Sequence, residues 1–139
     1  MNDVPLIRPD WPAPARVRAV TTTRLGGVSS GPFESLNLGA GVPDAPHDID
    51  ENRRRLSAAA GLPAEPCWLK QVHGQRVVDA GDQTGSPPDA DAAIARRAGA
   101  VCAVLTADCL PVAFCDRFGS RVGIAHAGWR GLAAGVLEN

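Results

Sequence analysis

Residues 111–125 read Pro-Val-Ala-Phe-Cys-Asp-Arg-Phe-Gly-Ser-Arg-Val-Gly-Ile-Ala, which is two short apolar runs separated by a polar turn. This arrangement is typical of a β-hairpin, with Gly119 supplying a positive φ in the connection. Antiparallel pairing across the turn joins residues whose numbers sum to about 236, which places Cys109 roughly opposite His126. A register error of one or two residues would make them diagonal neighbours, still within reach of a shared ion.

Further extended segments are expected before the hairpin. Alternating or continuous apolar patterns predict strands over residues 17–23, 67–72, 75–79, 90–95 and 100–105. His73-Gly74 separates two of these segments and is expected to form a tight break. Residues 25–46 are rich in Gly, Ser, Pro and Asn, which predicts a long loop.

One helix is predicted after this loop. Asp48 followed by Glu51 is a capping-box pattern, and Gly61 is a helix-ending residue. The apolar residues expected on one face of the helix are Ile49, Leu56 and Ala60. The run Arg53-Arg54-Arg55 is expected on a solvated face.

A second helix is predicted from residue 128 onward, because Trp129, Leu132 and Val136 have helical spacing. This helix would reach Asn139 without a C-cap, so we expect further protein to cover its apolar face. The length of 139 residues favours one domain, and we expect residues 1–139 to be a single domain that is incomplete at its C-terminal end.

Composition excludes several classes of function. The 14 basic and 15 acidic residues nearly balance and form no Lys/Arg-rich face, so no nucleic-acid partner is expected. The first twenty residues are too charged for a signal peptide, and the longest apolar run, 98–105, is too short to span a membrane. The four Cys show no C-x-x-C spacing, which favours reduced thiols in a cytoplasmic protein.

Three residues that bind transition metals stand at the ends of extended segments: His73, Cys109 and His126. Two imidazoles and one thiolate leave one position open on a tetrahedral zinc, which is the arrangement of a catalytic site. Their separations of 36 and 17 residues match no local zinc signature, so the type and spacing of these residues leave an alternative open. Cys109 could equally be a nucleophile that His126 activates without any metal.

Other polar residues have two interpretations each. Arg24 and the Gly/Ser-rich residues after it could surround a phosphate, or could form an ordinary turn. Asn37 could contact a substrate, although an Asx turn is its commoner role. His47 is expected at the surface and not as a metal ligand.

Seven motifs along the chain carry a resemblance to a known family. They are Thr21-Thr-Thr-Arg-Leu-Gly-Gly-Val-Ser29, Leu36-Asn-Leu-Gly39, Asp50-Glu-Asn-Arg53, Leu69-Lys-Gln-Val-His-Gly74, Asp89-Ala-Asp91, Leu105-Thr-Ala-Asp-Cys-Leu-Pro-Val112 and Ala125-His-Ala-Gly-Trp-Arg-Gly131. In this order they resemble the YfiH-like family, whose members are labelled polyphenol oxidase, laccase-domain protein or purine nucleoside phosphorylase.

The resemblance implies an α/β (α+β) fold, a layered α/β/β/α sandwich with mixed sheets, of which this chain would be the N-terminal portion. It also implies a zinc site at His73, Cys109 and His126. The implied activity is phosphorolysis of adenosine, inosine, guanosine or methylthioadenosine, together with adenosine deamination. For deamination, zinc-activated water would attack purine C6, with Asp108 as a candidate for proton transfer.

The same resemblance raises the question of copper chemistry. A multicopper oxidase needs a His-rich cluster in addition to a site with two His and one Cys, and the chain has three His in all. Zinc is therefore favoured over copper. Arg24 and its loop are the hypothesis for the phosphate site, and family members are expected to continue beyond the motif that ends at Gly131.

Overall fold

The computed structural model of the chain describes residues 3–139, which form two compact units. The first unit comprises residues 3–11 and 19–62, and the second comprises residues 12–18 and 63–139. The assignment of residues 1–139 to one domain stays a prediction.

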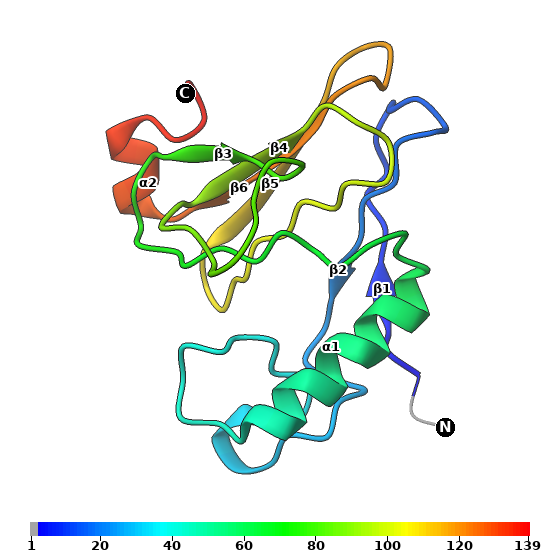
Figure 1. The fold of residues 1–139 in the computed structure, drawn as a ribbon, viewed down its shortest axis with the longest axis vertical. Coiled ribbons are helices and arrows are strands. Elements are labelled where there is room, and N and C mark those ends of the chain that lie inside the picture. The colour runs from blue at the N-terminus through cyan, green and yellow to red at the C-terminus, as the bar shows by residue number, and fades with distance from the viewer. Residues whose placement is uncertain (1–2) are drawn as a thin grey trace. The chain divides into compact units, whose positions relative to one another are not determined.

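The first unit contains a small sheet and one long helix. Strand β1 (Leu6–Ile7) pairs antiparallel with β2 (Thr21–Thr22), followed by the short 3-10 helix η1 (Gly31–Phe33) and helix α1 (Pro46–Ala60) (Figure 1). The strand predicted over 17–23 is therefore wrong in its length. Its partner β1 is only two residues long, so the ladder has nothing further to pair with.

Helix α1 begins earlier than its capping pattern indicated. Its N-cap is Ala45, which makes no side-chain hydrogen bond, and Pro46 occupies the first turn. The prediction of Asp48 as a capping residue is wrong, because proline at the first helical position starts the helix without needing an N–H partner. Asp48 instead places a carboxylate in the first turn. The predicted end is confirmed, since Gly61 follows the helix with a left-handed φ of 59°.

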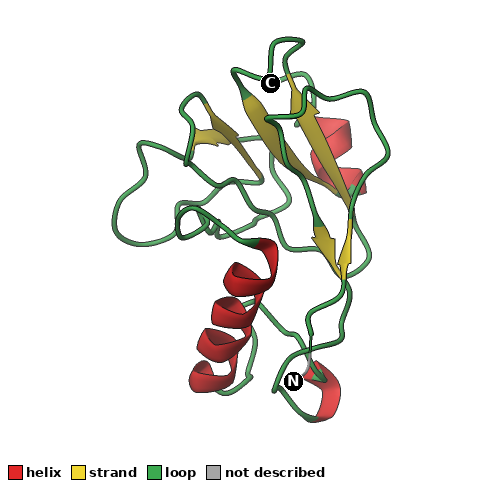
Figure 2. Ribbon diagram, turned by 90° about the vertical axis from the view of Figure 1, so that its right-hand side faces the viewer, coloured by secondary structure: helices red, strands yellow, loops and turns green. Residues whose placement is uncertain are grey.

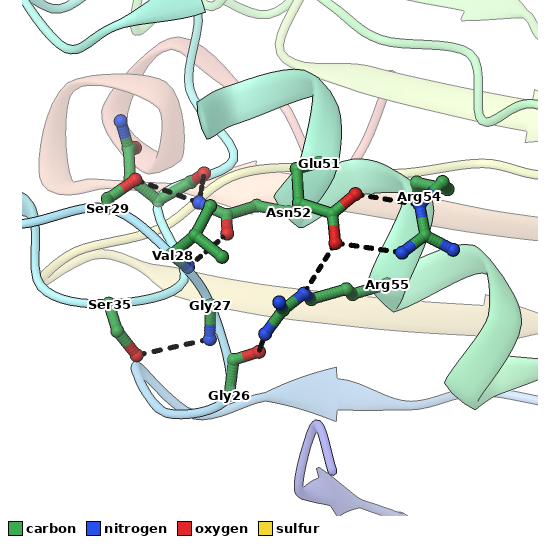
Figure 3. Close-up of polar contacts among 10 residues, drawn as sticks. Gly26, Gly27, Val28, Ser29, Ser35, Glu51, Asn52, Arg54 and Arg55 are labelled. Carbon is green, nitrogen blue, oxygen red and sulfur yellow. Dashed lines mark hydrogen bonds and ion pairs between the residues drawn. The ribbon is translucent and has the colours of Figure 1, made fainter. Parts of the chain in front are cut away.

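The buried face of α1 contains the predicted Ile49, Leu56 and Ala60, and also one polar residue, Asn52. Asn52 is fully buried; its Oδ1 accepts the N–H of Val28, and its Nδ2 donates to the Ser29 hydroxyl (Figure 3). The same Nδ2 donates to the Asn37 carbonyl. One amide side chain thus attaches the irregular 25–46 loop to the helix.

Two of the three arginines of α1 also attach the 25–46 loop to the helix. Arg53 donates to the Leu38 carbonyl. Arg55 donates to the Gly26 carbonyl while pairing with Glu51 (Figure 3). The expected solvated arginine face is therefore wrong for Arg53 and Arg55. Arg54 alone of the three remains mostly exposed, paired with Glu51.

The second unit is built on a four-stranded sheet in the order β3-β4-β6-β5 (Figure 1). Its strands are β3 (Val77–Asp79), β4 (Ala92–Ala95), β5 (Leu110–Cys115) and β6 (Val122–Ala127). Strands β3 and β4 are parallel, and the other two pairs are antiparallel. The prediction of a mixed α/β fold is confirmed.

The hairpin of β5 and β6 is confirmed with a register shift of about one residue. Leu110 pairs with Ala127 and Pro111 pairs with His126, so the paired numbers sum to 237. Cys109 precedes the first pair and lies diagonal to His126, not directly opposite it. Gly119 has the expected positive φ, at 68°.

Residues 67–72 and 100–105 are not strands, in contrast to the prediction. They form isolated parallel bridges, at Cys67 with Cys102 and at Lys70 with Asp89. A side chain replaces the missing ladder, because Gln71 Nε2 donates to the Leu105 carbonyl and Gln71 Oε1 accepts the Leu105 N–H, both at 2.7 Å. These segments still supply the core, where Leu69 packs with Val78, Ala90 and Ala93.

Helix α2 (Trp129–Ala134) follows β6 directly and lies beside the sheet (Figure 2). It is shorter than predicted, because Gly135 adopts a left-handed φ of 93° and ends it. Val136, just beyond, is buried against Ala92 and Ala125. Among the described residues, no helix has the length and apolar character needed to cross a membrane.

Candidate metal centre

The structure brings the three predicted metal ligands together. His73 lies in the turn before β3, Cys109 immediately precedes β5, and His126 lies within β6. Their ligand atoms all lie within 4.8 Å of one another. The two imidazole rings meet edge to face, with centroids 4.8 Å apart.

The donor set fits zinc. Zn–N bonds of about 2.0–2.1 Å and Zn–S bonds of about 2.3 Å place tetrahedral donors roughly 3.3–3.6 Å apart. The side chains would need to approach one another by only about 1 Å, and two of them, the exposed His73 and the half-buried Cys109, have room to move. Two nitrogens and one sulfur also leave a fourth position free for water or substrate.

A buried carboxylate lies behind this group. Asp91 is fully buried immediately before β4, and its Oδ2 lies 2.8 Å from His126 Nδ1. The backbone adds to this contact, because the His126 N–H donates to the Asp91 carbonyl at 2.7 Å. Asp91 thus holds both the ring and the backbone of His126. His126 itself is buried, with 4% of its surface exposed.

Asp91 also holds the turn that carries His73. Its Oδ1 accepts the N–H groups of Val72 and Gly74, and its Oδ2 accepts the N–H of His73. His73 is the one non-glycine residue with positive φ among the described residues, at 59°. Such a conformation costs about 1–2 kcal/mol for an ordinary residue. Three charge-assisted hydrogen bonds from consecutive residues offset that cost.

The local electrostatics favour a bound cation. Burial acts to raise the pKa of Asp91, but hydrogen bonds from His126 and from three backbone N–H groups together hold it below its ordinary value. The pKa of Cys109 is raised, first by burial and then by the carboxylates of Asp108 and Asp91. A metal ion would reverse this effect on Cys109, because coordination favours the thiolate.

Gly128 leaves the space that Cys109 occupies. A Cβ at this position would lie 2.9 Å from Cys109 Sγ and 3.4 Å from His73 Cδ2. The backbone of Gly128 is ordinary, with a φ of −77°. A glycine is therefore required here by the approach of the sulfur and not by backbone conformation.

Asp108, the predicted proton-transfer residue, is exposed beside the site. The Cys109 thiol contacts Asp108 Oδ1 at 3.7 Å. Its role in proton transfer stays a prediction.

The predicted substrate residues belong to the first unit. Arg24 donates through Nε and one terminal nitrogen to the Glu34 carbonyl. The loop N–H groups that could have bound phosphate are engaged within the chain: Gly27 donates to Ser35 Oγ and Val28 to Asn52 (Figure 3). Ser29 donates to the Ser35 carbonyl. Phosphate binding here stays a prediction that would rest on the Arg24 side chain.

Asn37 forms the Asx turn that was its alternative interpretation, since its Oδ1 accepts the Gly39 N–H at 3.0 Å. Its Nδ2 donates to Asp44. Contact with a substrate stays a prediction. His47 lies at the surface, as expected, with its side chain 83% exposed beside Asp48.

Asp91 is the residue whose importance the sequence did not reveal. It occurs in a short Asp-Ala-Asp motif that carries no metal-ligand spacing. The available signal was its place at the start of an apolar strand, where a charged residue needs a buried partner. Identifying that partner as His126 requires the pairing of β4 with β6.

The chain is similar to proteins that are named as purine nucleoside phosphorylases. A protein of Pseudomonas aeruginosa named as a purine nucleoside phosphorylase is 59% identical over 132 residues, which cover 95% of this chain and 53% of that protein. The purine nucleoside phosphorylase YfiH of Escherichia coli is 55% identical, with coverage of 96% of this chain and 55% of that protein. The chain spans about half the length of the curated relatives it matches.

Solved structures confirm the fold. A Neisseria meningitidis protein matches with a TM-score of 0.89 and 52% identity, over 96% of this chain and 55% of that one. YlmD from Geobacillus stearothermophilus matches with a TM-score of 0.85 and 36% identity, over 94% of this chain and 52% of that one. The family model described as multi-copper polyphenol oxidoreductase laccase matches residues 18–139. The resemblance to YfiH-like proteins is thereby confirmed. The chain belongs to the family described as multi-copper polyphenol oxidoreductase laccase.

Proposed function

We propose that this chain carries the metal centre of a zinc-dependent purine nucleoside phosphorylase that also deaminates adenosine. The observation that carries the proposal is the convergence of His73, Cys109 and His126, with a buried carboxylate behind His126. The names of the Pseudomonas and Escherichia relatives support the choice of purine nucleosides as substrates. Four free cysteines support a reducing compartment, the cytoplasm.

His73, Cys109 and His126 would hold the ion. Bound zinc with an open position supplies Lewis acidity and a water that loses its proton near neutral pH. In phosphorolysis, a phosphate oxygen bonds to ribose C1′ as the C1′–N9 bond breaks, and the purine leaves with that electron pair and takes up a proton. In deamination, water oxygen adds to C6 and ammonia leaves. Asp108, exposed beside Cys109, is the proposed group for proton transfer.

Arg24 and Asn37 are kept as the proposed phosphate and substrate contacts. Two of the five guanidinium N–H donors of Arg24 serve the Glu34 carbonyl. Arg24→Lys is therefore expected to raise the KM for phosphate while leaving kcat for deamination unchanged, because deamination uses no phosphate. An equal effect on both reactions would exclude this role.

The proposed function is tested by product analysis. Zinc-loaded protein is incubated with adenosine and phosphate, and adenine, ribose 1-phosphate and inosine are measured. His73→Ala is expected to abolish all three products, whereas the matched variant His47→Ala changes a surface imidazole that is not proposed as a ligand and should leave them unchanged. Equal turnover by the wild type and His73→Ala would refute the zinc assignment.

A metal-free cysteine hydrolase is the second candidate. The thiol of Cys109 lies near the imidazole of His126, which contacts the carboxylate of Asp91. Enzymes with a nucleophile, a base and an orienting carboxylate use the same spatial arrangement. The raised pKa of Cys109 opposes this candidate, because it reduces the thiolate population. Activity that survives complete zinc removal and disappears in Cys109→Ser would favour the hydrolase over the zinc enzyme.

Oxidation by copper, which the family description names, needs a different set of metal ligands. A multicopper centre needs a His-rich cluster in addition to a site with two His and one Cys, whereas zinc needs only the three donors that meet here and one open position. Zinc therefore remains the proposed ion for this group.

A further inference from the structure

Two histidines of the site come from separate parts of the chain, yet both depend on one buried side chain. The Asp91 carboxylate receives four contacts: three backbone N–H groups of residues 72–74 and Nδ1 of His126. No buried side-chain nitrogen or oxygen among the described residues lacks a hydrogen-bond partner, so this arrangement is complete without water.

The contact with His126 determines which ring nitrogen can bind a metal. An ionised carboxylate only accepts hydrogen bonds, so His126 Nδ1 must carry the proton that it donates to Asp91. The lone pair of a neutral imidazole is then on Nε2, the nitrogen left for the ligand group. Metal-binding histidines generally need such a partner on their second nitrogen.

The contacts with residues 72–74 determine where His73 lies. Asp91 Oδ2 is shared between the His73 N–H and His126 Nδ1, at 2.9 Å and 2.8 Å. One oxygen atom therefore sets the spacing between the backbone of one ligand and the ring of the other. The positive φ of His73 makes this turn unfavourable without such support.

We propose that Asp91 is the positioning residue of the metal centre, fixing the Nε2-binding tautomer of His126 and the turn that presents His73. This inference rests on the proposed metal binding by His73, Cys109 and His126. Asp91 would bind no metal itself, because its two oxygens are already used by the four donors.

The substitution Asp91→Asn separates this role from simple packing. Asparagine has nearly the same shape but offers one accepting oxygen and one donating NH2 group. With the oxygen toward His126, the NH2 group faces the N–H groups of Val72 and Gly74. With the NH2 group toward His126, the ring must adopt the other tautomer, which places a proton on Nε2. Either orientation disturbs one ligand.

The experiment uses the full chain and zinc alone as the probe. Zinc affinity is measured by competition with a chromophoric chelator, and Asp91→Asn is expected to bind about 10- to 100-fold more weakly than the wild type. Asp44→Asn is the matched control: its carboxylate also accepts several hydrogen bonds, from Ser29, Asn37 and Ala45, and its zinc affinity should equal that of the wild type. Equal affinities of wild type and Asp91→Asn would overturn the inference.

A second measurement needs no variant. The nitrogen-15 shifts of the imidazoles in the metal-free wild type should show His126 with its proton on Nδ1. A proton on Nε2 would overturn the inference even if the variant failed to fold. A wild type that binds no zinc but shows the Nδ1 tautomer would instead refute the proposed metal function.

Discussion

Substitution of Gly128 tests the spacing of the metal centre most directly. An alanine Cβ would lie 2.9 Å from Cys109 Sγ, whereas non-bonded heavy atoms prefer about 3.5–4.0 Å. The sulfur would therefore have to move by roughly 0.6–1.1 Å. Metal binding requires the ligands to approach one another by about 1 Å, and a Cβ against both Cys109 Sγ and His73 Cδ2 would oppose that approach.

Overpacking of this kind costs about 1–3 kcal/mol. In the metal-free chain, the Cys109 side chain can turn away and avoid most of that cost. Metal binding requires its return, so the cost falls on affinity, which should decrease about 5- to 150-fold at roughly 1.4 kcal/mol per factor of ten. Chelator competition measures the affinity, and thermal unfolding of the metal-free protein measures the stability.

Two further variants isolate the cause. Gly128 is also the N-cap of α2, where serine is a better capping residue than alanine. Gly128→Ser should therefore recover helix stability but still bind zinc weakly, because it carries the same Cβ. Gly41→Ala, at a position with nothing within 4 Å, should leave affinity unchanged. Zinc binding by Gly128→Ala within twofold of the wild type would refute the spacing argument.

Three other outcomes are expected. The pKa of Glu51 is lowered to about 2, first by Arg54 and then by Arg55, so its carboxylate contributes stability above its ordinary pKa of 4.5 that is lost as the pH falls toward 2. In Glu51→Gln the unfolding midpoint should therefore depend less on pH between 4.5 and 2. The same pH dependence in the variant and the wild type would exclude the contribution. Asn52→Ala should destabilise the chain by about 3 kcal/mol in denaturant unfolding, because its buried partners lose their hydrogen bonds. Arg54→Ala, which removes an exposed ion pair with Glu51, should destabilise it much less. Zinc should slow the alkylation of Cys109 at pH 8. Cys102, whose pKa burial raises to about 12, should react slowly with or without zinc. An alkylation rate of Cys109 that zinc does not change would contradict its role as a ligand.

Local sequence patterns predicted the parts of the fold that depend on neighbouring residues. Gly119 and the apolar runs on either side of it predicted the β5–β6 hairpin, and with it the proximity of Cys109 and His126. Gly61 predicted the end of α1 because its left-handed conformation acts within one turn of the helix.

Patterns failed where distant parts of the chain decide the structure. Residues 67–72 look like a strand, but Gln71 bonds to Leu105 through its side chain and leaves only isolated bridges. Asp91 has no unusual neighbours in sequence, and its importance arises only when β4 lies beside β6. His73 was a candidate by residue type and by its place at the end of an extended segment, but nothing in its spacing relates it to Cys109, and the family resemblance supplied that relation.

The sheet order β3-β4-β6-β5 has a consequence for how the centre assembles during folding. The β5–β6 hairpin closes a short loop and can form within about 1–10 μs, which brings Cys109 and His126 together early. Strand β4 joins β6 only after a much longer loop has closed, at a larger entropic cost. Asp91, whose carboxylate holds the His73 turn, immediately precedes β4 and is placed with it. A refolding chain should thus acquire its third ligand late, and high-affinity zinc uptake would report the completion of the sheet.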